Sequence, residues 1–103
     1  MGNDPRISID HRRLGDLCRR WRITELALFG SVMRDDFRPE SDVDVLLTFA
    51  PDAGWSLFEI VELQRLLEEL FGRRVDVVEQ NAIRNPYRRE AIMATRQVIY
   101  EAA

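Results

Sequence analysis

The chain has 103 residues, of which 46% are hydrophobic and 32% are charged, and its formal net charge is −3. This size and balance predict a single folded domain over residues 1–103 and exclude a disordered tail, a collagen-like repeat and a disulfide scaffold. The acidic balance also argues against direct binding to nucleic acid, which needs a broad basic surface.

The compartment is indicated by cysteine content and by the lack of long apolar runs. Cys18 is the single cysteine and has no partner for an internal disulfide, which favours a reducing environment. No apolar run approaches the roughly 18 residues of a membrane span, and the first ten residues lack the hydrophobic core of a signal peptide. We therefore expect a cytoplasmic protein with no membrane segment.

The first predicted elements are a helix and a strand. Between residues 8 and 21, apolar side chains recur at the spacing of one helical face, at Leu14, Leu17, Cys18 and Trp21. Residues 24–29 (TELALF) then predict a first core strand, which ends at a Gly-Ser turn followed by a short helix to about residue 35.

The Gly-Ser turn is a candidate phosphate site. Gly30 allows the backbone to approach a ligand closely, and Ser31 adds a hydroxyl donor to the backbone N–H groups. Arg34 and Arg38 come shortly after, and guanidinium groups match phosphate oxygens in pairs. A Gly-Ser pair alone is also typical of ordinary turns, so its weight depends on the residues that come after it.

Two acidic residues begin the next predicted strand, residues 42–49 (DVDVLLTF). The two-residue period of a strand places Asp42 and Asp44 on one face, where their charges repel each other. A hard cation such as Mg²⁺ would compensate that repulsion. The alternative is an edge strand that uses charge to avoid aggregation.

The second half of the chain predicts a helix, a strand and a closing helix. Ser56 and Glu59 have the form of a capping box, and Gly72 ends the helix that this box opens. The apolar face that we predict for this helix consists of Leu57, Ile60, Val61, Leu67, Leu70 and Phe71. Asn85-Pro86 is typical of a helix start, and that helix should reach about residue 96, with 97–100 as its end or as a short strand.

The predicted strand 73–79 (RRVDVVE) carries a third acidic residue, Asp76, between valines. A carboxylate there is costly unless it is paired or binds a metal, although a lone aspartate would more often be a structural hydrogen-bonding residue. With Asp42 and Asp44 on a neighbouring strand, Asp76 is the expected third metal ligand. Three carboxylates can hold two metal ions for nucleotidyl transfer, while Gly30 and Ser31 hold the β- and γ-phosphates.

These motifs together resemble the minimal nucleotidyltransferase (MNT) family of the DNA polymerase β-like nucleotidyltransferase superfamily. The family motif often has the form FGSxARGxxxxxSDxDLLV, and this chain has FGSVMRDDFRPESDVDVLL, with the RRVDVVE strand after it. The resemblance covers nearly the whole chain. It implies an α/β (α+β) fold of the polymerase β type, with a small mixed sheet of three or more strands flanked by helices.

The resemblance also implies a function. MNT proteins are typically antitoxins of HEPN-domain toxins, in type VII-like pairs, and transfer AMP from ATP to a tyrosine of the toxin. Asp42, Asp44 and Asp76 match the catalytic, metal-binding positions, and Gly30, Ser31 and Arg34 match the nucleotide-binding positions. The expected cofactor is Mg²⁺, as two ions, with ATP as substrate and the toxin as partner in a hetero-oligomer.

One departure from the family pattern falls beside the Gly-Ser turn. Asp35 stands where the family commonly has glycine, and Asp36 adds a second acid close to the expected triphosphate. Two alternatives to a protein-modifying enzyme therefore stay open. One is an antitoxin that neutralises by binding alone, and the other is a small-molecule transferase similar to aminoglycoside-modifying enzymes.

Overall fold

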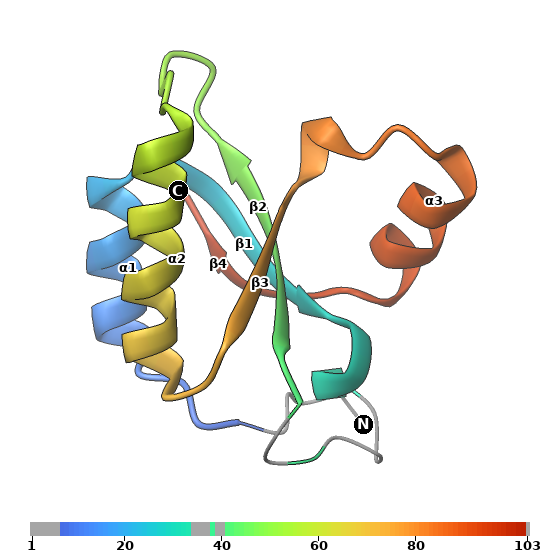
Figure 1. Cartoon of the computed structure of the whole chain (residues 1–103), viewed down its shortest axis with the longest axis horizontal. Coiled ribbons are helices and arrows are strands. Elements are labelled where there is room, and N and C mark those ends of the chain that lie inside the picture. The colour runs from blue at the N-terminus through green and yellow to red at the C-terminus, as the bar shows by residue number, and fades with distance from the viewer. Residues whose placement is uncertain (1–6, 34–37, 39–40, 103) are drawn as a thin grey trace.

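The computed structural model describes residues 7–33, 38 and 41–102 of the chain. Within these ranges, three α-helices, two short 3-10 helices and four strands follow one another (Figure 1). In chain order they are α1 (His11–Arg20), β1 (Ile23–Phe29), η1 (Gly30–Met33), β2 (Val43–Phe49), α2 (Leu57–Phe71), β3 (Val75–Glu79), η2 (Gln80–Ala82), α3 (Pro86–Thr95) and β4 (Gln97–Glu101). None of the helices in these ranges has the length and apolar content needed to cross a membrane.

The four strands form one mixed sheet in the order β3-β2-β1-β4. β1 is antiparallel to β2 and β4, whereas β2 and β3 are parallel. Parallel neighbours need a crossover connection, which α2 supplies. The predicted fold class is confirmed, and the residues left open between a helix end and a strand form the edge strand β4.

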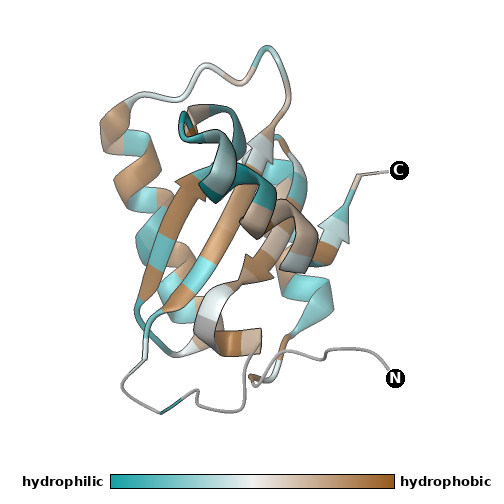
Figure 2. Ribbon diagram, turned by 90° about the vertical axis from the view of Figure 1, so that its right-hand side faces the viewer, coloured by the Kyte–Doolittle hydropathy of each residue, from teal (hydrophilic) through white to brown (hydrophobic). Residues whose placement is uncertain are grey.

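Helices cover both faces of the sheet. α1 and α2 lie on one face and α3 lies on the other (Figure 1). The α1/α2 side encloses the larger hydrophobic cluster, which includes the fully buried Val43, Val45 and Leu47 of β2. Leu46, which alternates with them, joins the smaller cluster beneath α3 with Ile92. Hydrophobic residues thus dominate the strands, although hydrophilic segments interrupt them (Figure 2).

Local capping signals set the helix boundaries. The Asp10 side chain accepts a hydrogen bond from the Arg13 backbone N–H at 3.1 Å, so α1 begins at His11, three residues later than predicted. The Ser56–Glu59 capping box is present in both directions, and Gly72 ends α2 in the left-handed conformation with φ 70°. The predicted start and end of α2 are both confirmed. Each is set by residues within one helical turn, so the sequence alone was sufficient to predict it.

The predicted apolar face of α2 is partly wrong. Its buried residues are Leu63, Leu67 and Phe71, while Leu57 and Val61 are 78% and 59% exposed. At 3.6 residues per turn, Val61 lies about 160° around the helix from Leu63. The helix can bury only one of these two faces against the sheet, and the face that contains Leu63 is the one packed on the core.

Candidate active site

The Gly-Ser turn is held against a carboxylate of the neighbouring strand. Gly30 directly follows β1 with φ 76°, a left-handed conformation that favours glycine. Phe29 is paired with Asp44 in the β1–β2 register, so the turn passes close to that aspartate. A Cβ atom on residue 30 would lie 2.2 Å from Asp44 Oδ2. Only glycine lets the backbone approach Asp44 this closely.

Asp44 and Asp76 lie side by side on the face of the sheet that α3 covers only in part. They are direct partners in the parallel β2–β3 register, on strands roughly 4.8 Å apart. Asp44 is half-buried and Asp76 is exposed. The hydrophobic cluster under α3 lies farther along the same face, at Leu46 and Val78. Two carboxylates and the Gly30-Ser31 turn therefore meet at one end of the sheet.

The third predicted ligand, Asp42, forms an ion pair with an arginine. It lies one residue before β2, and its Oδ1 forms an ion pair with Arg74 Nε at 3.3 Å. The two side chains are 49% and 80% exposed, and an ion pair that exposed contributes at most about 1 kcal/mol. Among the described residues, no three acidic, histidine or cysteine side chains are close enough together to hold a metal ion. The structure therefore brings together two of the three predicted ligands.

The donor set nevertheless fits a hard divalent cation. All three candidate ligands are carboxylates, which Mg²⁺ prefers, and Asp44 and Asp76 already share one face. Asp42 is two residues from Asp44, and its ion pair with Arg74 is solvent-exposed and weak. A cation that gains a third carboxylate would more than compensate for the lost ion pair.

The remaining predicted residues are the phosphate-binding groups. Ser31 lies in η1 beside Gly30, where the first N–H groups of a helix lack intrahelical acceptors and can face a phosphate. Arg34 lies outside the described residues, as do Asp35 and Asp36. Arg38 is described, and its carbonyl accepts a hydrogen bond from Ser41 N at 2.9 Å.

Two arginines at the start of β3 are functional candidates that the sequence pattern did not single out. Arg74 contacts Asp42, and Arg73 Nη1 donates to the Arg38 carbonyl at 3.3 Å, which connects the loop before β2 to the start of β3. The sequence signal that could have identified them is the pair of adjacent arginines two and three residues before Asp76. The parallel register sets Val75 beside Val43, and this pairing brings Arg74 next to Asp42.

The single cysteine has no place in this site. Cys18 is fully buried in α1, and burial raises the pKa of its thiol to about 12. Because the thiolate is the reactive form, this residue is a packing group and not a nucleophile.

A glycine turn next to carboxylates on adjacent strands offers the kinds of group that nucleotidyl transfer needs. In agreement, the family model of the nucleotidyltransferase domain matches residues 12–99. The chain belongs to this family.

Relatives and solved structures agree with that assignment. The protein adenylyltransferase MntA of Thermococcus cleftensis is 33% identical over 85 residues, which cover 82% of this chain and 81% of that protein. A solved minimal nucleotidyltransferase is 32% identical, with a TM-score of 0.69 over 84% of this chain and 86% of its own. The fold also matches a toxin–antitoxin structure with AMP-PNP, at 17% identity and a TM-score of 0.72 over 91% of this chain and 75% of that one.

Proposed function

We propose that this chain is a Mg²⁺-dependent protein adenylyltransferase that acts as an antitoxin. It would transfer AMP from ATP to a hydroxyl group, preferably of tyrosine, on a HEPN-family toxin partner in the cytoplasm, as one half of a type VII-like pair. The observation that carries the proposal is the contact of Gly30 with Asp44, which lies in register with Asp76. Support for the acceptor comes from relatives named protein adenylyltransferase, and support for the partner comes from the toxin–antitoxin structures of the same fold.

The proposed reaction is a single in-line displacement. The acceptor oxygen forms a bond to the α-phosphorus of ATP, and the bond from that phosphorus to the bridging oxygen of pyrophosphate breaks. The acceptor proton passes to solvent, and pyrophosphate leaves. Mg²⁺ held by Asp42, Asp44 and Asp76 would stabilise the charge on the attacking and leaving oxygens.

The chain's own residues position the nucleotide for this step. The backbone at Gly30 and Ser31 offers N–H donors to the β- and γ-phosphates, and Arg34 remains a predicted phosphate contact outside the described residues. Asp44 and Asp76 place negative charge next to that turn, where they would hold a divalent cation that offsets the charge of the triphosphate.

Label transfer from ATP tests the proposal. The wild-type chain is incubated with Mg²⁺, the toxin encoded by the adjacent gene and ATP labelled on its α-phosphate. We expect label on the toxin, and a loss of at least about 100-fold in the Asp44→Asn and Asp76→Asn variants, since each removes a charged metal ligand. Asp16→Asn, which changes an exposed aspartate of α1, is the matched control and should leave transfer unchanged.

The two alternatives predict other results in the same assay. An antitoxin that only binds would form the complex without moving label, and Asp44→Asn would then neutralise the toxin as well as the wild type does. A small-molecule transferase would label an added aminoglycoside and leave the toxin unlabelled. Either result would contradict the proposed activity.

A further inference from the structure

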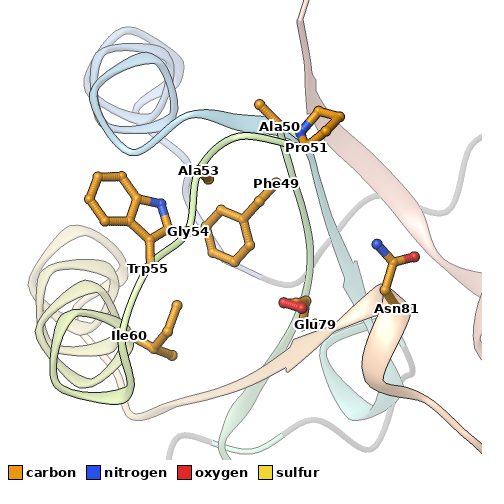
Figure 3. Close-up of a pocket in the computed structure, with 9 residues that line it drawn as sticks. All are labelled: Phe49, Ala50, Pro51, Ala53, Gly54, Trp55, Ile60, Glu79 and Asn81. Atoms are coloured by element: carbon orange, nitrogen blue, oxygen red, sulfur yellow. The ribbon is translucent and has the colours of Figure 1, made fainter.

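The end of the sheet opposite the active site contains a pocket with no role in nucleotidyl transfer. Its volume is about 320 Å³, and it lies where β2 and β3 end (Figure 3). The residues that line it are Phe49, Ala50, Pro51, Ala53, Gly54, Trp55, Ile60, Glu79 and Asn81. Phe49 follows Asp44 by five residues, which separates them by about 16 Å along the strand and places them on opposite faces. A molecule bound in the pocket would not cover the nucleotide site.

The walls of the pocket combine aromatic surface with one carboxylate. Trp55 and Ile60 lie on one side, Glu79 and Asn81 lie on the other, and the Phe49 ring lies between them (Figure 3). The Trp55 ring is fixed in place, because its Nε1 donates to the Trp21 carbonyl at 2.7 Å and its ring packs 4.9 Å from that of Trp21. A rigid aromatic wall next to a carboxylate suits an arginine or lysine side chain, since its stem packs on the rings and its charge meets Glu79.

An exposed apolar patch continues from this pocket onto the first turns of α2. Leu57, Phe58 and Val61 are 78%, 88% and 59% exposed, and they are three of the four large hydrophobic residues exposed in the described part of the chain. They lie two to six residues after Trp55 and on both sides of Ile60 in the sequence, and both Trp55 and Ile60 line the pocket. Clustered apolar exposure of this kind marks interaction surfaces, because water is released when a partner covers it.

Some of the carboxylates around the patch are paired with arginine. Asp52 forms an ion pair with Arg22 and Glu62 forms one with Arg65, so the carboxylates that remain for a partner's charge are Glu59 beside the patch and Glu79 at the pocket wall. Hydrogen bonds from the Ser56 backbone and side chain hold the pKa of Glu59 below its ordinary value, so that it stays ionised. A partner that matches this surface presents apolar side chains together with arginine or lysine.

We propose that the pocket and the Leu57–Phe58–Val61 patch form a docking surface for a basic, amphipathic segment of the toxin. The partner's identity rests on the proposed function, whereas the surface itself does not. An interface of standard size covers about 800 Å² on each protein, which is about an eighth of the 6816 Å² surface of this chain. Docking at this end therefore leaves Asp44 and Asp76 accessible, and binding and modification of the toxin become separable.

The substitution Phe58→Asp tests the docking surface without endangering the fold. Residue 58 is exposed in the first turn of α2, where a negative charge is favourable to the helix dipole. We expect the Kd for the adjacent-gene toxin, measured by titration calorimetry, to rise at least about tenfold, which is the behaviour of an aromatic anchor. Phe58→Leu keeps the apolar contact and should stay within about threefold of the wild type.

A second variant tests the charge that we assign to the partner. Glu79→Arg should also raise the Kd at least about tenfold, because it places like charges together in the pocket. AMP transfer to the toxin should show a raised KM with an unchanged kcat for both Phe58→Asp and Glu79→Arg. Asp44→Asn should give the reverse pattern, with transfer lost and the Kd unchanged.

Each alternative result has a definite meaning. Unchanged Kd and KM in Phe58→Asp and Glu79→Arg overturn the docking surface and leave the proposed activity standing. Binding that depends on Phe58 without any AMP transfer keeps the docking surface and overturns the activity. A dimer of this chain alone in sedimentation, dissociated by Phe58→Asp, assigns the surface to a second copy and overturns the proposal, as does a toxin that does not bind the wild type.

Discussion

The two ends of the β2–β3 pair differ in the kind of residue that they expose. At the end where β2 and β3 begin, three aspartates and the arginines Arg73 and Arg74 lie around a glycine turn. At the end where they finish, the exposed groups are aromatic, aliphatic and acidic, apart from Arg22, which is paired with Asp52. The first end has the mixed charges that metal and phosphate binding require, and the second has the apolar surface that protein binding requires.

This difference shows how a chain of this size can hold two sites. Successive residues of a strand point to opposite faces, so Asp44 and Phe49 face different sides of the same strand. The sheet separates the two sites, and its buried residues Val45, Leu46 and Leu47 form the core between them. Substitutions at one end should therefore act on one property and leave the other unchanged.

Gly30→Ala should give the largest effect, on the chemistry and not on the docking of the toxin. The new Cβ would lie 2.2 Å from Asp44 Oδ2, so the short aspartate side chain must move away. We expect AMP transfer to fall at least about 100-fold, since the displaced group is a proposed metal ligand. Unfolding in urea should show a loss of about 1–2 kcal/mol, the cost of a left-handed conformation for alanine.

Gly72→Ala is the matched control for that substitution. Gly72 has a similar φ of 70°, but an added Cβ there would meet no atom within 4 Å. It should lose a similar amount of stability and keep full transfer activity and toxin binding. Equal losses of activity in both variants would show that Gly30 acts only through stability.

Ser56→Ala should have an intermediate effect, confined to the docking end. Ser56 Oγ accepts from Glu59 N at 3.3 Å, and Glu59 Oε1 accepts from Ser56 N at 2.9 Å. Losing this cap should cost about 1 kcal/mol, or roughly 4–8 °C in Tm, and should weaken toxin binding because Leu57 and Phe58 lie in the turn that loosens.

The pH dependence of this cap has a definite sign. The Ser56 hydrogen bonds lower the folded-state pKa of Glu59 below 4.5, so its contribution to stability is present above that value. The contribution is lost as the pH falls through the lowered pKa. The difference in Tm between the wild type and Glu59→Gln should therefore shrink toward acid pH, and a difference that grows would contradict the assignment.

The features whose placement could be predicted from the sequence depend on local or periodic patterns. Strand periodicity and the Gly-Ser turn were sufficient to predict that Gly30, Asp44 and Asp76 lie close together. Core strands next to such turns can pair in few ways. The caps at Ser56 and Asn85 are set within a few residues and were equally predictable.

The parts that were missed depend on contacts distant in sequence. The rotation of α2 about its axis, which exposes Leu57 and Val61, is set by the sheet beneath it and not by its own apolar pattern. The Asp42–Arg74 ion pair depends on the parallel register of β2 and β3, which a sequence pattern does not specify. Both features concern the surface, where burial places little constraint on sequence.

Arg74→Gln should give the smallest effect, and it tests what this arginine does at the active-site end. This variant releases Asp42 from an ion pair that is worth at most about 1 kcal/mol, so the Mg²⁺ concentration for half-maximal transfer should fall by up to about fivefold. Arg22→Gln, which breaks the exposed ion pair with Asp52 near the docking end, is the matched control and should leave the Mg²⁺ dependence unchanged. A rise in the Mg²⁺ requirement or in the KM for ATP would show instead that Arg74 binds the triphosphate. The guanidinium that this variant removes would then be a ligand of the nucleotide and not a competitor of Mg²⁺ for Asp42.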